Sequence, residues 1–566
     1  MVDGTLFLST PTNRVIALDA RTGTEQWVFD PKIDRGLNYS ELTSRGVSIW
    51  TDPVKALGEA GYRRLLLGTI DGRLLALDAE TGLPVIGFGD AGTVDLTQGV
   101  GTVEPGQYNI TSPPAVTADL VIVGSAIGDN RAVELERGIV RAYDVRSGEL
   151  RWSWDPIPRE PDDPGYETWN GPVAHKTGGA NAWPPLSVDL ERDLVFVPTS
   201  SPSPDYYGGE RLGQNLYANS VVALRASTGE PVWHFQTVHH DLWDYDVPMQ
   251  PLLFSLDRDG EPVPAVAIGT KQGHLFVMHR ETGEALFEVE ERPVPQSTVP
   301  GEESWPTQPF PAELPLFGLR EVAPDEAWGM TEEARAASQE QISAFRSEGL
   351  FTPPSLEGTI QAPGNLGGFN WGGLSYDPAR GLLVGATNRF AAVVTLVPRD
   401  DEAGEEERQE VAFEIGQQLG TPYRMERSAF VASDPQVPYT PPPWGTLAAV
   451  DLTTGTLAWE VPLGISIDPA LVPEAVNWGA VNLGGPTTTA SGLVFIAATL
   501  DGFFRAFDIE TGEIVWQVEL PAGGQATPMT YAVDGRQFVA IAAGGHGKFG
   551  IELGEHLVAY ALPVAD

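Results

Sequence analysis

One short phrase recurs seven times along the chain, and this repeat constrains the fold more than any other feature of the sequence. Each copy is an apolar run, a turn with Ser-Gly or Thr-Gly, and a second apolar run that usually holds Trp. The Gly accepts the positive φ of a tight turn, and the Trp supplies a large surface to bury. The copies are ALDARTGTEQW from Ala17, ALDAETGLPVI from Ala76, AYDVRSGELRW from Ala142, ALRASTGEPVW from Ala223, VMHRETGEALF from Val277, AVDLTTGTLAW from Ala449 and AFDIETGEIVW from Ala506.

A repeat of about 60 residues with several strands in each unit is typical of a β-propeller, in which every blade packs against its neighbours. A propeller can use all 566 residues as one closed ring. The content of 63 Gly and 48 Pro agrees, because many short strands need many turns. We therefore predict an all-β fold: an eight-bladed β-propeller with tryptophan-docking repeats, a single domain over residues 1–566, and short helical insertions.

The repeats also predict where the blades lie. Complete four-stranded units are expected at about 46–90, 113–156, 182–237, 247–290 and 484–520, and a further unit is divided between 370–387 and 446–462. Two insertions interrupt this series. The first, about 291–369, is expected to hold a helix over Thr331–Ser347 with Thr331 as its N-cap. The second, 389–443, is expected to be a surface excursion with some helix, and it includes the charged run Asp400–Glu410.

The two ends of the chain predict incomplete units. The first unit begins at Thr5–Ser9, which resembles a second strand, and the last stops after its third strand. Unpaired strand edges at a seam are a liability. We expect that the natural chain starts further upstream, and that this segment carried the closing strands together with a signal for the periplasm.

Composition excludes several classes of function. There is no Cys, which rules out disulfides, thiolate chemistry, zinc fingers and an attached c-type haem. The net charge of −42 argues against nucleic acid and against an anionic membrane surface as partners. No stretch is long and apolar enough to span a bilayer. The acidity by itself indicates a soluble surface.

The densest group of polar side chains is the segment VHHDLWDYDVP, residues 238–248. It holds His239, His240, Asp241, Asp244 and Asp246. Such a loop is more often a hydrogen-bonded connector than a catalytic element. A zinc site is an alternative, but adjacent His residues cannot easily both point at one metal.

The order of further motifs around this loop favours the catalytic interpretation. Arg45 lies in LTSRGVSIW, Trp183 in GGANAWPPL and Lys271 in GTKQGHLFV, at corresponding positions of successive units. In this order the chain resembles the pyrroloquinoline quinone (PQQ) dependent dehydrogenases, and within them the glucose and quinate dehydrogenase branch. The resemblance covers nearly the whole chain and rests on TSRGVSIW, QTVHHDLWDYDVP, TLDGFFRAFD, PAGGQATPMTY and AGGHGKFGIELGEHLVAYALP.

The resemblance implies a set of cofactor-binding residues. Trp183 would be the floor on which the flat quinone stacks, and an ordinary core Trp is the alternative. Asn370 would contact the quinone edge, or else only hold a turn. The carboxylates and carbonyls of the anionic cofactor would be bound by Arg45, Thr111, Ser125 and Lys271. For Arg45 and Lys271 the alternative is a surface ion pair.

The resemblance also implies Ca²⁺ beside the quinone, a hard cation that takes oxygen ligands. The corresponding residues are Asp129, Asn130, Ser203 and Asp244. Glu134 is an additional candidate. Ser201 competes with Ser203, and Asp129 could instead be a turn residue.

The mechanism implied is oxidation of an alcohol, sugar or cyclitol hydroxyl. Asp244 would take the hydroxyl proton, hydride would pass to the quinone, and Lys271 would stabilise the developing negative charge. Electrons would leave to an external acceptor such as a quinone, a cytochrome c or a copper protein. Trp50 stands where the glucose enzymes have a His, which favours a larger or more apolar alcohol.

Two alternatives stay open at this point. A non-catalytic eight-bladed propeller, a scaffold of the outer-membrane protein assembly type, would carry the same Trp phrases. The function of a scaffold does not require Trp183, Asp244 and Lys271 together with Arg45, so this combination favours the dehydrogenase. The other alternative is a relative of the dehydrogenases that has lost its cofactor.

Overall fold

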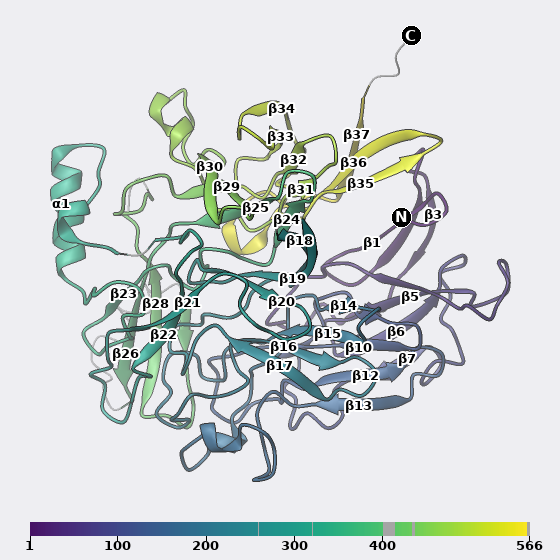
Figure 1. Ribbon diagram of the computed structural model, residues 1–566, viewed down its shortest axis with the longest axis horizontal. Coiled ribbons are helices and arrows are strands. Elements are labelled where there is room, and N and C mark those ends of the chain that lie inside the picture. The colour runs from purple at the N-terminus through teal and green to yellow at the C-terminus, as the bar shows by residue number, and fades with distance from the viewer. Residues whose placement is uncertain (259, 320, 400–413, 433–435, 563–566) are drawn as a thin grey trace. The chain divides into compact units, whose positions relative to one another are not determined.

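The repeated phrases fold into antiparallel sheets (Figure 1). The fold is given by a computed structural model that describes residues 1–258, 260–319, 321–399, 414–432 and 436–562. It comprises two units. Unit 1 contains residues 1–204, 213–236 and 533–535, and unit 2 contains 205–212, 237–532 and 536–566.

Unit 1 contains four meanders of three or four strands that follow one another along the chain. The first comprises β1 (Thr5–Ser9), β2 (Val15–Asp19) and β3 (Glu25–Phe29), and the second β4 (Ser48–Thr51), β5 (Arg63–Gly68), β6 (Arg73–Asp78) and β7 (Thr93–Asp95). The third comprises β9 (Ala115–Val116), β10 (Leu120–Val123), β12 (Val140–Asp144) and β13 (Leu150–Trp154), and the fourth β14 (Ser187–Asp189), β15 (Leu194–Pro198), β16 (Ser220–Arg225) and β17 (Pro231–Gln236). The short strands β8 (Tyr108–Asn109) and β11 (Ala126–Ile127) pair separately.

Unit 2 contains four more meanders of this kind. They are β18 (Leu252–Arg258), β19 (Glu261–Gly269) and β20 (Leu275–His279); β24 (Leu374–Asp377), β25 (Leu382–Asn388), β29 (Gly445–Asp451) and β30 (Thr456–Pro462); β31 (Thr487–Thr488), β32 (Leu493–Ile496), β33 (Phe503–Asp508) and β34 (Ile514–Glu519); and β35 (Met529–Val533), β36 (Arg536–Ala543) and β37 (His556–Ala561). Such meanders are the blades of a β-propeller. Their closure into one eight-bladed ring stays a prediction of the sequence.

The core of each unit lies between successive sheets. In unit 1, Leu66 of β5 packs with Val121 of β10, and Ile122 of β10 packs with Val195 of β15. The first strands β4, β9 and β14 are neighbours, and so are β18, β24 and β31 in unit 2. Both faces of a sheet are therefore covered, which explains why the strands read as nearly continuous apolar runs.

The Trp of one phrase contacts the Gly turn of a following phrase. Trp152 of β13 donates its Nε1–H to the Ala226 carbonyl (2.9 Å), and Trp459 of β30 does the same to Ile509 (2.8 Å). A Cβ at Gly229 would lie 2.6 Å from the Trp152 ring, and one at Gly512 would lie 2.7 Å from Trp459. Gly is required in these turns by both φ and space.

The predicted blades agree with the structure except at two places. At 46–90 the fourth strand is β7, which lies beyond the predicted end, and the run directly after the turn makes only a single bridge, between Leu77 and Pro84. The other exception is the unit at 247–290. There the sheet has three strands instead of four, because the segment after β20 makes only a single bridge, between Met278 and Ala285. The chain then leaves the sheet as β21 (Val289–Pro293), which pairs with β22 (Thr307–Pro311). The first and last sheets have three strands, as expected.

The first insertion contains the predicted helix. Helix α1 spans Glu332–Ser343, and the Thr331 side chain caps it by accepting a hydrogen bond from the Ala334 N–H (3.1 Å). The helix ends four residues before the predicted Ser347. The remaining helical segments are short 3₁₀ turns: η1 (Tyr166–Thr168), η2 (Ala174–Lys176), η3 (Pro324–Glu326), η4 (Pro473–Asn477) and η5 (Gly547–Phe549).

The second insertion differs from the prediction. Its described residues form strands rather than helix: β26 (Ala392–Pro398), β27 (Glu414–Gly416) and β28 (Tyr423–Ala429). Together with β23 (Thr359–Gln361) of the first insertion they form one sheet, in the order β23-β26-β28-β27. The charged run Asp400–Glu410 lies outside the described residues.

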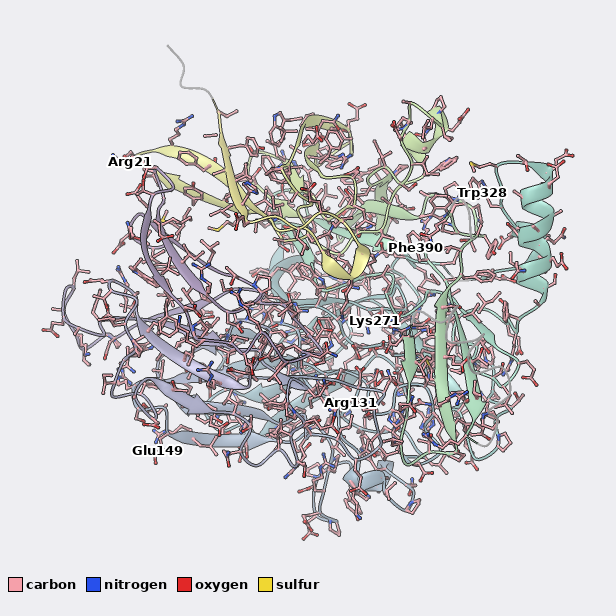
Figure 2. All side chains as sticks on the ribbon, turned by 180° about the vertical axis from the view of Figure 1, so that it is seen from behind. Arg21, Arg131, Glu149, Lys271, Trp328 and Phe390 are labelled. Atoms are coloured by element: carbon pink, nitrogen blue, oxygen red, sulfur yellow. The ribbon has the colours of Figure 1, made fainter. Side chains whose placement is uncertain are left out.

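The first insertion also contacts the residue that directly follows the second insertion. Trp328 of the first insertion, labelled in Figure 2, lies edge-on to Trp444 at a centroid distance of 5.2 Å.

In the part of the chain that the structure describes, no helix has the length and apolar character needed to cross a membrane.

Candidate functional site

The loop 238–248 of unit 2 is folded tightly around Asp241. Its carboxylate accepts hydrogen bonds from the backbone N–H groups of Trp243 and Tyr245, each at 3.3 Å. Asp244 has a φ of 59°, in the left-handed region that Asp tolerates better than most residues. This local turn sets the direction of the Asp244 and Asp246 side chains.

The first insertion holds the loop in place. Trp243 donates its Nε1–H to the Thr352 carbonyl (2.8 Å), and Gln361 donates to the Trp243 carbonyl (2.6 Å). The Tyr245 hydroxyl donates to the Pro363 carbonyl (2.5 Å). A loop anchored at three points keeps its charged side chains in fixed positions, as catalytic geometry requires.

Lys271 lies in the tight turn between β19 and β20, and it is labelled in Figure 2. Its Nζ is 2.6 Å from Asp244 Oδ1 and 2.9 Å from Asp246 Oδ2. The three residues are only 6%, 8% and 5% exposed, so this is a buried cluster and not a surface ion pair. Burial alone lowers the pKa of Lys271, but the two carboxylates raise it above its usual value. The lysine is therefore a fixed cation beside the carboxylates of Asp244 and Asp246.

The sequence did not predict two members of this cluster. Asp246 follows Asp244 by two residues, and the motif assigns it no role of its own. Arg427 of β28 lies with its Nη1 3.7 Å from Asp244 Oδ2. No sequence signal pointed to Arg427, because β28 lies in an insertion outside the repeats. We call Asp244, Asp246, Lys271 and Arg427 the ion-pair cluster.

A second group of predicted residues meets in unit 1. Arg45 donates from Nη1 to Thr111 Oγ1 (2.6 Å), and its backbone N–H donates to the Thr111 carbonyl (2.8 Å). The Arg45 guanidinium carbon lies 4.9 Å from the Trp183 ring centroid, a cation–π distance. Burial lowers the pKa of Arg45 to about 10. We call Arg45, Thr111, Ser125 and Trp183 the indole cluster.

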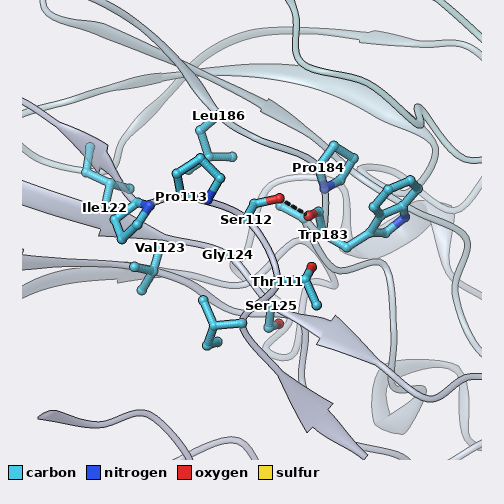
Figure 3. A pocket seen from close by; sticks show the side chains of 13 residues that line it. Thr111, Ser112, Pro113, Ile122, Val123, Gly124, Ser125, Trp183, Pro184 and Leu186 are labelled. Carbon is cyan, nitrogen blue, oxygen red and sulfur yellow. Dashed lines mark hydrogen bonds between the residues drawn. The ribbon is translucent and has the colours of Figure 1, made fainter. Parts of the chain in front are cut away.

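Ser125 completes the indole cluster. Figure 3 shows its hydroxyl beside that of Thr111 and near Trp183. Ser125 is 1% exposed, and within the described residues its Oγ has no hydrogen-bond partner. A cavity of about 10 Å³ adjoins these residues, which is room for one water molecule at most. A buried hydroxyl without a partner indicates a group that expects a ligand.

Of the candidate calcium ligands in unit 1, Asp129 and Asn130 are adjacent in the chain, and Ser203 contacts the same loop. The Asn130 amide is 3.4 Å from Asp129 Oδ1, and the Ser203 hydroxyl donates to the Ala132 carbonyl (2.8 Å). Glu134 lies apart from them, with a side chain 61% exposed and an oxygen 3.9 Å from Lys176. The competing Ser201 accepts a hydrogen bond from Asn219 (3.0 Å).

Asn370 and Trp50 occupy local structural roles. The Asn370 amide donates to the Leu366 carbonyl (2.6 Å), and its Oδ1 accepts from the Trp371 N–H (2.7 Å), so the side chain holds its own turn. Trp50 on β4 is 4% exposed and donates to the Ala118 carbonyl (2.9 Å). Its indole belongs to a core cluster that also holds Leu66 and Val121. The expected effect of Trp50 on the choice of substrate stays a prediction.

The structure thus brings the predicted residues together in two groups, one in each unit. The indole cluster and the calcium candidates belong to unit 1, whereas Asp244, Lys271 and Asn370 belong to unit 2. The meeting of both groups at one site stays a prediction.

The blades, the buried lysine–carboxylate cluster and the arginine-covered indole agree with the class of quinoprotein-type β-propellers. The family described as PQQ: Glucose/ethanol/alcohol dehydrogenase, beta-propeller domain, matches residues 1–539. The chain belongs to this family of PQQ-dependent dehydrogenases, within its glucose and quinate dehydrogenase branch.

Characterised relatives agree with this assignment. The quinoprotein glucose dehydrogenase of Escherichia coli is 38% identical over 99% of this chain and 72% of its own length. The quinate/shikimate dehydrogenase (quinone) of Acinetobacter baylyi is 36% identical with the same coverage. Among solved structures, the quinohemoprotein alcohol dehydrogenase of Comamonas testosteroni superposes with a TM-score of 0.68 at 26% identity, over 96% of this chain and 69% of that one.

The residues of the indole cluster fit PQQ chemically. The cofactor is a flat polyanion, and the cluster offers an aromatic face, a half-buried guanidinium and the unpartnered hydroxyl of Ser125. The carboxylate, amide and hydroxyl of Asp129, Asn130 and Ser203 fit calcium, which prefers such oxygen donors.

Proposed function

We propose that this protein is a PQQ- and Ca²⁺-dependent dehydrogenase that oxidises a hydroxyl of an alcohol, sugar or cyclitol in the periplasm. The observation that carries the proposal is the buried contact of 2.6 Å between Lys271 Nζ and Asp244 Oδ1. It combines a fixed cation with a carboxylate base, which is what proton abstraction from an alcohol requires. The names of the relatives, glucose and quinate/shikimate dehydrogenase, support a polyol or cyclitol substrate.

Each group of residues has its own role in this proposal. The indole of Trp183 stacks against the cofactor, and Arg45, Thr111 and Ser125 bind its charged and carbonyl oxygens. Asn370 contacts the edge of the cofactor through its second amide hydrogen, because the first donates to the Leu366 carbonyl within the turn. The metal is held by Asp129, Asn130, Ser203 and Asp244.

The chemistry of this chain's own residues is a proton transfer. When bound, PQQ supplies the acceptor for the two electrons that leave the substrate carbon as hydride. Asp244 Oδ accepts the hydroxyl proton, so the alcohol becomes a carbonyl with loss of one proton and one hydride. The Lys271 ammonium stabilises negative charge that develops on the oxygens facing it. Because its pKa is raised, Lys271 stays charged throughout and does not compete with Asp244 as a base.

The electrons then pass to an external acceptor, either a quinone or a cytochrome c. The Acinetobacter baylyi relative is a quinate/shikimate dehydrogenase (quinone), and this name supports a quinone as the acceptor. The alternative of a non-catalytic scaffold is not favoured, because the family and its characterised relatives are dehydrogenases.

The proposal is tested by reconstitution. The purified chain is incubated with PQQ and Ca²⁺, and dye reduction is screened across sugars, cyclitols and alcohols. Asp244→Asn should abolish turnover and preserve PQQ binding, measured by quenching of tryptophan fluorescence. Asp325→Asn, which removes an exposed carboxylate of η3, is the matched control and should retain full activity. Activity retained by Asp244→Asn would refute the assigned base.

A further inference from the structure

The sheet formed by the two insertions reaches the ion-pair cluster. Its strand β28 carries Arg427, which is 6% exposed although it bears a charge. The sequence indicated a surface excursion for this region, yet its described strands bury a guanidinium beside the proposed base. A buried cation is expensive unless it is well paired, so its partners indicate its role.

Arg427 has three partners. Its Nη1 contacts the hydroxyl of Tyr206 and lies 3.7 Å from Asp244 Oδ2, while its Nη2 contacts Glu414 on β27. Burial lowers the pKa of Arg427, but Tyr206, Glu414 and Asp244 raise it above its usual value. Burial likewise raises the pKa of Tyr206, which therefore stays a neutral phenol. The guanidinium is thus a permanent charge, fixed in place by one hydroxyl and one carboxylate.

The two oxygens of Asp244 face two different cations. Oδ1 is 2.6 Å from Lys271, which comes from the turn between β19 and β20, and Oδ2 is 3.7 Å from Arg427. Asp246 and Glu414 neutralise the outer sides of the two cations. Negative and positive side chains therefore alternate in one connected row, in the order Asp246, Lys271, Asp244, Arg427 and Glu414. A carboxylate held from both sides cannot rotate freely.

We infer that Arg427 is a positioning residue of the dehydrogenase reaction, which holds the carboxylate plane of Asp244 in the orientation needed to accept the substrate proton. This inference rests on the proposed function, since it takes Asp244 as the base. It assigns a catalytic purpose to the insertion sheet, which carries none of the repeat motifs. Loss of Arg427 leaves Glu414 partly solvated, with its side chain 38% exposed, and removes the cation that lies 3.7 Å from Asp244 Oδ2.

The test compares Arg427→Gln and Arg427→Lys with the unchanged enzyme, all loaded with PQQ and Ca²⁺. We expect Arg427→Gln to lower kcat by roughly 10- to 100-fold with KM changed less than about threefold, because misplacing a reacting group slows chemistry more than binding. With a substrate deuterated at the reacting carbon, its isotope effect on kcat should rise, since the chemical step becomes limiting. The kcat of Arg427→Lys should be within about fivefold of the original value. Lys restores the positive charge but not the planar guanidinium with its two parallel donors.

Arg424→Gln is the matched control. It also removes a largely buried guanidinium from β28, but Arg424 pairs with Glu426 (3.5 Å) and is not part of the ion-pair cluster. It should leave kcat and the isotope effect unchanged. A similar loss in both variants would indicate damage to the sheet and overturn the inference.

The inference and the proposed function fail in different ways. If Asp244→Asn is inactive but Arg427→Gln has the original kcat, only the inference is wrong. If Asp244→Asn is active, the proposed base is wrong. Should Arg427→Gln not fold, a crystal structure and the kcat of Arg427→Lys decide. A displaced Asp244 carboxylate with unchanged kcat would overturn the inference, and a displacement with reduced kcat would support it.

Discussion

The ring of Trp152 lies against Gly229, in the turn of the next repeated phrase, and its Nε1–H donates to the Ala226 carbonyl at 2.9 Å. One aromatic side chain therefore joins two sheets through a hydrogen bond and through contact with a residue that has no side chain. The same contact joins Trp27 to Gly82 and Trp459 to Gly512, so it recurs wherever a phrase with Trp is followed by a Gly turn of this kind.

The first prediction concerns Gly229. Its φ is 77°, and an added Cβ would lie 2.6 Å from the Trp152 ring. We expect Gly229→Ala to lower the free energy of unfolding by about 2–4 kcal/mol, from overpacking together with backbone strain. Urea unfolding followed by tryptophan fluorescence measures the change.

Gly23 supplies a matched control for this prediction. It occupies the same position of the first phrase with a φ of 73°, but a Cβ added there would have no atom within 4 Å. Gly23→Ala should cost only about 1 kcal/mol, from the positive φ alone. Equal losses in the two variants would show that the indole contact contributes nothing.

The second prediction concerns the unpartnered hydroxyl of Ser125. Removing a buried hydroxyl that makes no hydrogen bond costs the apo protein little, so Ser125→Ala should match or exceed it in thermal stability. The same change should weaken PQQ binding by roughly tenfold, the effect of about one hydrogen bond. Fluorescence quenching by added PQQ gives the affinity.

Ser112 is the comparison residue, because it lines the same cavity but its hydroxyl donates to the Trp183 carbonyl at 2.6 Å (Figure 3). Ser112→Ala should lower the free energy of unfolding of the apo protein by about 1 kcal/mol. If Ser125→Ala destabilises the apo protein as much as this variant does, the interpretation of its hydroxyl as a ligand group fails.

The sequence predicted the blades well because each phrase contains its own local signals. The Gly turn between β12 and β13, the following Trp152 and the N-cap Thr331 are all determined by residues that are close in the chain. The fourth strand expected after β20 was wrong, because the chain pairs β21 with β22 instead. That choice depends on a partner that lies outside the repeat.

The site was only partly predictable for the same reason. Lys271 and Asp244 could be proposed from motifs, but Arg427 approaches them from 156 positions further along than Lys271, in a sheet without repeat signals. The burial of Trp50 could not be predicted from its motif, because the two faces of a strand alternate and the motif does not say which face is buried. Pairing of side chains across elements is a tertiary property that spacing does not encode.

The third prediction concerns a buried pair between His240 of the loop 238–248 and Glu302 of the first insertion. Glu302 Oε1 lies 2.7 Å from His240 Nε2, with side-chain exposures of 2% and 0%. Burial acts to raise the pKa of Glu302, but His240, the Gly208 N–H and Arg211 lower it below its usual value of 4.5. A lowered folded-state pKa stabilises the protein above the unfolded-state pKa, and this contribution is lost as the pH falls through the folded-state pKa.

We therefore expect Glu302→Gln to lower the free energy of unfolding by about 3–5 kcal/mol at pH 7, because it breaks a buried pair. The difference from the unchanged protein should shrink as the pH falls from 4.5 through the lower folded-state pKa of Glu302, because the carboxylate is then protonated in the folded protein as well. Urea unfolding at a series of pH values measures both. Glu303→Gln, an exposed neighbour, should show no such dependence, and a pH-independent loss in Glu302→Gln would contradict the argument.

The last prediction concerns the proposed metal. Asp129 is exposed and carries a carboxylate beside the Asn130 amide, so replacing it with Asn removes charge without removing an oxygen donor. Calcium affinity depends strongly on ligand charge, and we expect Asp129→Asn to need roughly tenfold more Ca²⁺ for the same rise in Tm after chelation. Glu134→Gln removes a nearby carboxylate that lies towards Lys176 instead, and should leave the calcium dependence unchanged. If Glu134→Gln weakens calcium binding and Asp129→Asn does not, Glu134 is the metal ligand of this loop and Asp129 is a turn residue.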